Sequence, residues 1–327
     1  MVGDERRGKA RGAGEAYGEA PAALKLPRDV QVIERGWLSA NSILLRSPRG
    51  TTVVDSGYGA HAAQTVALLE RALGGNPLER LVNTHCHSDH MGGNAALRRR
   101  FRCRTSIPAG EAPLIDRWDE RELILANADQ RAERFDYDDT FADGDTLAMG
   151  EHEWRVLAAP GHDTHAVVFH SPETRVLISG DALWENGFGA VFAQLFGRET
   201  ALAETRATLE RIAGLGCEIV IPGHGRPFGE VDSALARAFA RLEGYEQDIT
   251  RLARHVVKVL FTFALLEKRS MPLAEVPAYL ERVAILAEVN RSYLKKTPAA
   301  LAEWLVADLE RAGALERRDG KLLARGS

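Results

Sequence analysis

The stretch Asn83–Asn94, NTHCHSDHMGGN, holds four potential metal ligands within six consecutive positions: His85, His87, Asp89 and His90. Imidazole is the commonest metal ligand among protein side chains, and carboxylates also bind metals. Burying four such groups without a metal would leave several polar atoms in need of partners. The stretch therefore predicts a metal site, and Gly92 and Gly93 predict a close backbone approach as the chain turns away from it.

The spacing of these ligands favours two metal ions over one. In an extended segment, His85 and His87 point to the same side, because side-chain directions repeat every two residues. Asp89 and His90 lie where the chain is expected to turn into a helix, so they should face a neighbouring point.

Three later motifs offer further ligands, each directly after a predicted strand: His162 in PGHDTH, Asp181 in SGDAL and His224 in IPGHG. One ion could take His85, His87 and His162, and the other Asp89, His90 and His224. Asp181 could bridge the two ions together with a shared water. A bridging hydroxide is a nucleophile at neutral pH, because metal binding lowers the pKa of water.

The coarse pattern of the chain divides it into three parts. Residues 1–24 are predicted to be a mobile tail, and residues 25–231 a catalytic domain of strands alternating with helices, with every candidate ligand at a strand end. Residues 232–327 are predicted to be a helical module. It begins with a long helical tract over 233–269, broken at Gly244, and ends with a helix, a strand, a turn at Asp319-Gly320 and a second strand, which is winged-helix-like.

Composition narrows the class of protein. The chain has 327 residues, 45% hydrophobic and 27% charged, which is ordinary for a globular protein, and its net charge of −4 disfavours a protein built around nucleic acid. No apolar run is long enough to span a membrane. Three scattered cysteines favour the cytoplasm. We expect a small-molecule substrate, and a C-terminal module that serves as a lid or homodimer interface, or alternatively binds nucleic acid.

The complete ligand pattern resembles the metallo-β-lactamase-fold hydrolases, whose signature is H-x-H-x-D-H followed by His, Asp and His. The resemblance covers roughly residues 28–230, including VVDSG at Val53–Gly57. It implies an αββα four-layer sandwich, in the α/β (α+β) class, with a dinuclear site at one edge of the sheets. It also implies that Asp55 orients a ligand histidine, although Asp55 alone would equally be interpreted as a turn residue. Because it has Asp181, the sequence resembles the glyoxalase II-like and lactonase-like branch and not the true β-lactamases.

A few other residues are candidates for substrate contact. Trp184 and Phe188 lie in the loop after Asp181, and one or the other is expected to touch substrate, although aromatic residues more often pack in cores. Tyr58 could donate to a developing oxyanion, but a packing role is favoured. His165 could lie near the metals or the substrate, but a structural hydrogen bond is favoured.

These observations lead to a principal hypothesis and three alternatives. The first is a hydrolase with two divalent ions, expected to be Zn²⁺ although Fe or Mn would fit, that attacks an ester, thioester or lactone carbonyl with a bridging hydroxide. Asp181 or Asp89 could also hold or shuttle the proton. The alternatives are a metal-dependent phosphodiesterase acting on single-stranded RNA, an iron-dependent sulfur dioxygenase, and a non-catalytic regulator that binds DNA through the C-terminal module.

Overall fold

The computed structural model describes residues 24–325, and two β-sheets form its centre. The first sheet has the order β1-β2-β3-β4-β5-β6, made of β1 (Val30–Ile33), β2 (Ser42–Ser47), β3 (Gly50–Val54), β4 (Leu78–Val82), β5 (Arg104–Pro108) and β6 (Asp139–Phe141). The second has the order β11-β10-β9-β8-β7, made of β7 (Thr146–Met149), β8 (His152–Ala158), β9 (Val167–Ser171), β10 (Val176–Gly180) and β11 (Ile219–Pro222). The tail predicted over 1–24 lies, apart from Leu24, outside the described residues.

Successive side chains along the strands enter buried cores on opposite faces, which makes these sheets the two inner layers of a sandwich. In β2, Ile43 and Leu45 enter the core between the sheets, whereas Leu44 packs on the outer face. In β10, Ile178 enters the same inter-sheet core, whereas Leu177 faces the opposite way. Strands buried on both faces in this way need a helical layer on each side.

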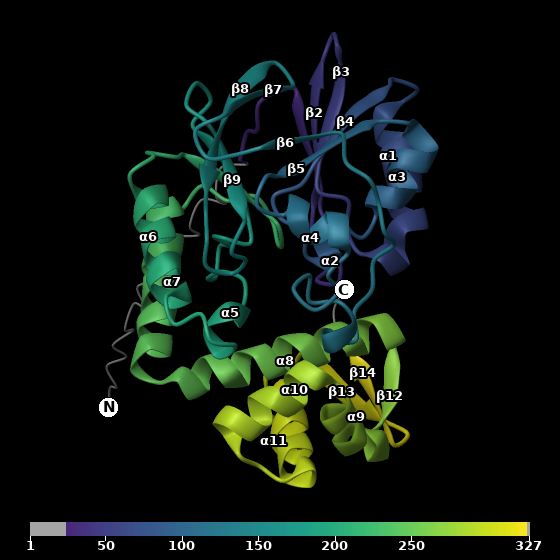
Figure 1. The fold of residues 1–327 in the computed structure, drawn as a ribbon, viewed down its shortest axis with the longest axis vertical. Coiled ribbons are helices and arrows are strands. Elements are labelled where there is room, and N and C mark those ends of the chain that lie inside the picture. Colours follow the sequence, from purple (N-terminus) through teal and green to yellow (C-terminus); the bar gives the residue numbers. More distant parts are fainter. Residues whose placement is uncertain (1–23, 326–327) are drawn as a thin grey trace, which may run out of the picture.

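The helical layers cover both outer faces (Figure 1). On the first sheet lie α1 (Ala62–Leu73) and α3 (Asn94–Phe101), with α2 (Ser88–Met91) and α4 (Ala112–Arg117) nearby; on the second lie α6 (Ala201–Ala213) and α7 (Val231–Gln247), preceded by α5 (Phe192–Leu195). The αββα sandwich predicted from the sequence is confirmed. Helix α1 ends at Leu73, and its C-cap Gly74 has the left-handed conformation (φ 57°) that glycine favours at helix ends.

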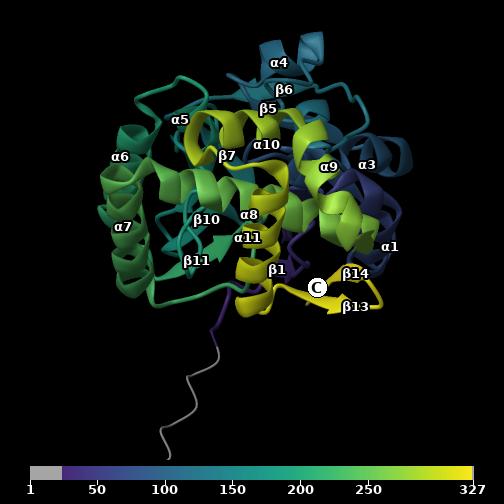
Figure 2. The same ribbon diagram turned by 90° about the horizontal axis from the view of Figure 1, so that it is seen from below.

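The long helix α8 (Ile249–Lys268) runs beneath the sandwich, between it and the C-terminal elements (Figures 1 and 2). After it come β12 (Ser270–Pro272), α9 (Val276–Arg282), α10 (Ala284–Val289), α11 (Pro298–Arg311), β13 (Leu315–Arg318) and β14 (Lys321–Ala324). The three strands form a small sheet of order β12-β14-β13. This helix–strand–helices–hairpin sequence agrees with the winged-helix-like module that the sequence predicted.

The predicted break of the helical tract at Gly244 is wrong. Helix α7 continues through Gly244 to Gln247, and the chain bends at Asp248, which has an extended conformation (φ −147°). The Asp248 carboxylate accepts a hydrogen bond from the Thr250 N–H at 2.9 Å and so caps the start of α8. The capping side chain, and not the glycine, decides where one helix ends and the next begins.

One continuous hydrophobic core joins the second sheet to the C-terminal elements. Leu177 and Val220 of that sheet belong to the same buried cluster as Leu252, Phe261 and residues of α9 to α11. This core therefore extends across residue 231, where the sequence placed a boundary. Within the part of the chain that the structure describes, no helix is both long and apolar enough to cross a membrane.

Candidate metal centre

All the candidate ligands gather at one edge of the sandwich, because each follows the end of a strand. The four ligands in residues 85–90 come after β4, Asp181 directly follows β10, and His224 lies two residues after β11. Strands β10 and β11 are parallel, so their carboxyl ends deliver Asp181 and His224 to the same place. His162 comes from the loop between β8 and β9. The described ligand atoms form two groups: His85, His87 and His162, and Asp89, His90, Asp181 and His224.

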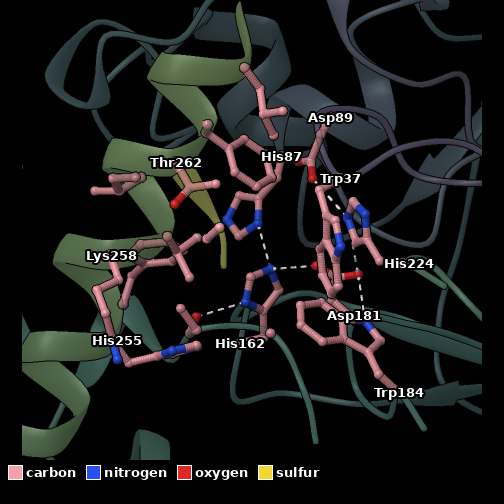
Figure 3. A pocket seen from close by; sticks show the side chains of 18 of the residues that line it. Trp37, His87, Asp89, His162, Asp181, Trp184, His224, His255, Lys258 and Thr262 are labelled. Atoms are coloured by element: carbon pink, nitrogen blue, oxygen red, sulfur yellow. Dashed lines mark hydrogen bonds and ion pairs between the residues drawn. The ribbon is translucent and has the colours of Figure 1, made fainter. Parts of the chain in front are cut away.

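The first group consists of three imidazoles whose ring nitrogens converge. His87 Nδ1 lies 2.9 Å from His162 Nε2, and the ring of His85 lies edge-on to both (Figure 3 shows the His87 and His162 rings). His162 donates its Nδ1–H to the Ala190 carbonyl oxygen at 2.7 Å, which leaves Nε2 free to face the group. These are the donor atoms that a tetrahedral histidine site requires.

The second group mixes imidazoles with carboxylates. Asp89 Oδ2 lies 3.0 Å from His224 Nε2 and 3.9 Å from His90 Nε2. Asp181 joins the two groups, since its Oδ2 lies 3.4 Å from His162 Nε2 and its Oδ1 lies 3.3 Å from His90 Nε2. A single carboxylate thus presents one oxygen to each group, which is the arrangement that a bridging ligand needs.

Unpartnered buried nitrogens test whether these residues fit metal ions. His85 Nε2 and His90 Nε2 are buried and have no hydrogen-bond partner among the described residues. Burial lowers the pKa of His85 well below its usual value and that of His87 to about 4, so both rings are neutral lone-pair donors at neutral pH. The donor set and its protonation therefore fit divalent ions that take nitrogen and oxygen ligands.

In the second group, the electrostatics around His90 and Asp181 indicate a demand for positive charge. Burial opposes the charged form of His90, yet Asp181, Asp55 and Asp89 together raise its pKa well above the usual value. Burial alone would raise the pKa of Asp181, but His90 and His224 hold it well below its usual range. Buried carboxylates of this kind need a compensating positive charge, which a bound cation supplies.

Asp55 lies directly behind one candidate ligand. His90 donates its Nδ1–H to Asp55 Oδ2 at 2.7 Å, which fixes the ring so that Nε2 faces the second group. Asp55 also accepts hydrogen bonds from the backbone N–H of Thr84 at 2.9 Å and from the Thr84 hydroxyl at 2.8 Å. Its backbone is left-handed (φ 60°), a conformation that Asp and Asn tolerate better than most residues.

We expect Asp55→Asn to lower metal affinity by about 10- to 100-fold, the usual cost of losing a carboxylate behind a ligand histidine. Asparagine tolerates the left-handed backbone, so the change removes the charge and leaves the chain path intact. Metal titration followed by spectroscopic readout measures the effect. The matched control is Asp136→Asn at an exposed position; equal affinities of the two variants would contradict a positioning role for Asp55.

The glycines that follow the cluster permit the close approach that the sequence predicted. A Cβ on Gly92 would lie 2.3 Å from the Gly59 N and from the Ser88 O, and one on Gly93 would lie 2.4 Å from the Ser56 O. Both clashes are with backbone atoms that cannot swing aside. Gly92 and Gly93 therefore let α2 and α3 pack against the turn that carries Asp55.

Sequence reasoning missed a pair of acids beside His87. Asp163 Oδ2 lies 3.6 Å from His87 Nε2, on the far side of the ring from the nitrogen that faces His162. Behind it, the buried Glu111 accepts a hydrogen bond from the Cys86 N–H at 3.3 Å. The position of Asp163 next to His162 was a usable signal. No sequence motif indicated Glu111, because it reaches this place from the end of a different strand, β5.

A largely apolar cavity of about 490 Å³ opens onto both ligand groups. One side is aromatic: Trp37 stacks on the His224 ring with centroids 5.4 Å apart, and Trp184 meets Trp37 edge-on at 5.3 Å (Figure 3). The opposite wall comes from α8, including Lys258, Thr262 and Phe263 (Lys258 and Thr262 are labelled in Figure 3). Trp37 remains 47% exposed at the cavity mouth.

Of the four residues that the sequence proposed for substrate contact, Trp184 lines the cavity and the other three do not. Trp184 lines the cavity and donates its Nε1–H to Asp181 Oδ1 at 3.2 Å. Phe188 does not line it; it is 1% exposed and packs edge-on against Tyr245. Tyr58 is buried away from it and donates to Glu267 Oε2 at 2.8 Å. His165 packs against Gly110, and its backbone N–H donates to Asp163 Oδ1 at 2.7 Å.

The αββα sandwich, with two groups of potential metal ligands at its edge, has the architecture of the metallo-β-lactamase fold. A family model described as the metallo-beta-lactamase superfamily matches residues 35–224, more than half of the chain. The chain belongs to the metallo-beta-lactamase superfamily.

Curated relatives carry the name hydroxyacylglutathione hydrolase. One from Rhizobium etli is 27% identical over 161 residues, 49% of this chain and 53% of the relative. One from Rhodopseudomonas palustris (strain HaA2) is 32% identical over 131 residues, 40% of this chain and 43% of the relative. The chain thus spans about half the length of the curated relatives it matches.

Solved structures agree on the fold over nearly the whole chain. A metallo-beta-lactamase family protein from Thermus thermophilus has a TM-score of 0.55 at 22% identity and covers 91% of this chain and 99% of its own. A beta-lactamase domain protein from Burkholderia ambifaria has a TM-score of 0.54 at 22% identity and covers 95% of this chain and 96% of its own. At this identity, the likeness is one of fold alone.

Proposed function

We propose that the protein is a hydrolase that uses two divalent metal ions to cleave an ester, thioester or lactone at its carbonyl group. The observation that supports this most directly is Asp181, whose two oxygens face the two ligand groups at 3.3 and 3.4 Å. The relatives named hydroxyacylglutathione hydrolase support an ester-type bond, and a thioester in particular.

The proposed ligands are His85, His87 and His162 for one ion and Asp89, His90 and His224 for the other, with Asp181 between them. When bound, such ions polarise a carbonyl oxygen and lower the pKa of a water molecule that can then attack it. Zinc is the metal we expect, although histidine and carboxylate sites also take iron or manganese.

The surrounding residues of the chain orient and protect this centre. Trp184 fixes Asp181 through its indole N–H, Asp55 fixes His90, and the Ala190 carbonyl fixes His162. The aromatic side of the cavity and the apolar residues of α8 keep bulk water away from the reacting carbonyl, which strengthens electrostatic interactions there.

Elemental analysis combined with a substrate panel tests the proposal. We expect about two transition-metal ions per chain, and hydrolysis of thioesters or esters that is lost on chelation and restored by metal. A single iron per chain would favour the sulfur dioxygenase alternative instead. Cleavage of single-stranded RNA without any ester hydrolysis would favour the phosphodiesterase, and absence of any tightly bound metal would rule out all three activities.

A further inference from the structure

One corner of the cavity is basic, and it lies outside the residues that the family model matches. Arg241 of α7 and both His255 and Lys258 of α8 line the cavity, whereas the match ends at residue 224. Figure 3 shows His255 and Lys258 on the α8 side, across the His87 and His162 rings from Trp37 and Trp184. Burial, together with the charges of Arg241 and Lys258, lowers the pKa of His255 to about 3, so its ring is neutral at neutral pH and can only donate or accept hydrogen bonds.

Among the described residues, Lys258 has an acidic partner, whereas the other cationic group of this corner, Arg241, has none. Within the described chain, Arg241 forms no ion pair or side-chain hydrogen bond, and its guanidinium lies over Gly187, where an added Cβ would come within 2.4 Å of Nη1. His255 Nε2 is buried and unpartnered among the described residues. Lys258 pairs with Asp308 at 3.1 Å. A half-buried guanidinium without an acid is costly unless a ligand completes the pairing.

The charge balance of the whole cavity extends this point. Among the described residues that line it, the acids are Asp89 and Asp181, both proposed metal ligands. Two divalent ions would more than neutralise those two carboxylates. Arg241, Lys258 and Arg325 also line the cavity, and Lys258 and Arg325 pair with Asp308 and Glu316. The unpaired Arg241 therefore leaves these mostly apolar walls with a net positive charge. Such a cavity favours an anionic ligand, and a guanidinium is the group best shaped to bind a carboxylate.

We propose that the cavity takes a substrate with an apolar body and a carboxylate, which binds at the basic corner formed by Arg241, His255 and Lys258. This inference rests on the proposed hydrolase function and specifies its substrate class. The scissile carbonyl lies at the ligand groups, the apolar body lies along α8, and the carboxylate pairs with Arg241.

Two pairs of thioesters test the substrate class. In the first pair, the same thiol carries a glutaryl group either as the free carboxylate or as its methyl ester. In the second pair, a butyryl group is carried by 3-mercaptopropionate or by its methyl ester. We expect the carboxylate member of one pair to have a kcat/KM about 10-fold or more above its methyl ester, mainly through KM, with the preference weakening as salt is added.

Arg241→Gln should remove most of that preference, while His255→Gln and Lys258→Gln should reduce it less. The matched control is Arg237→Gln, one turn earlier on α7, where the side chain is exposed and donates to the Glu185 carbonyl oxygen; it should retain the preference. If Arg241→Gln lowers kcat/KM equally for carboxylate and methyl ester, its role is structural and the inference is overturned.

A binding measurement separates this inference from the proposed hydrolase function. Glutarate and its dimethyl ester are titrated into the metal-loaded protein, with tryptophan fluorescence as the readout, since Trp37 and Trp184 line the cavity. Tighter binding of glutarate that Arg241→Gln weakens about 10-fold supports the basic corner, even if no thioester is hydrolysed. Equal affinity of glutarate for the unsubstituted protein and for Arg241→Gln overturns it. Hydrolysis of all four thioesters at equal rates overturns it as well and leaves the hydrolase proposal standing.

Discussion

Asp181→Asn should lower kcat/KM for ester or thioester hydrolysis by at least about a thousandfold, equivalent to about 4 kcal/mol of lost transition-state stabilisation. Asparagine has nearly the same shape, so the backbone after β10 should be undisturbed. It lacks the second anionic oxygen, however, and Asp181 is the carboxylate whose oxygens face both ligand groups. The metal content should also fall, by about one ion per chain or more.

Kinetics and elemental analysis on the same preparation measure both effects. Asp319→Asn is the matched control, because that side chain is 91% exposed on the turn between β13 and β14. The control should retain full metal content and activity. Full metal content and full activity in Asp181→Asn would instead show that Asp181 does not join the two groups.

Phe261→Ala is expected to cost about 3–5 kcal/mol of unfolding free energy, the range for truncating a fully buried phenylalanine. Phe261 lies on α8 with no exposed surface, packs on Tyr279, and belongs to the cluster that includes Leu177 of the second sheet. The cavity left by its removal therefore affects the sandwich as well as the C-terminal elements.

Urea unfolding provides the measurement, through a lower midpoint at an unchanged m-value. Phe196→Ala is the matched control: the same substitution at a phenylalanine that is 44% exposed should change stability by no more than about 0.5 kcal/mol. Equal effects of the two substitutions, or a separate early transition in Phe261→Ala alone, would mean that the C-terminal elements are not part of a common core.

The sequence was most informative where structure is local. Each candidate ligand lies in the segment that follows a strand, and these segments meet at one edge of the sandwich, so short motifs were enough to predict which side chains would gather. The αββα fold was predicted from the family resemblance that the complete ligand pattern carries, and not from the strand pattern itself. The assignment of individual ligands to metal ions remains a prediction.

What the sequence could not provide depends on packing between distant segments. Trp37 reaches His224 from a loop nearly two hundred positions earlier, and Phe263 comes from a helix that looks like an ordinary amphipathic helix. Phe188 was one of two candidates for substrate contact, with Trp184, because both lie in the loop after Asp181. It turns instead into the core against Tyr245, a contact that only the position of α7 makes possible.

The two sides of the cavity are encoded in separate stretches of the chain. All seven proposed ligands precede residue 225, whereas the wall formed by α8 begins at residue 255. Random mutation of Val259, Phe263 and Leu266 could therefore change which molecules are accepted without altering any proposed ligand. Under selection, such a chain could acquire new substrates through substitutions in one helix while its proposed ligands stay the same. A directed-evolution library confined to α8 would use the same separation.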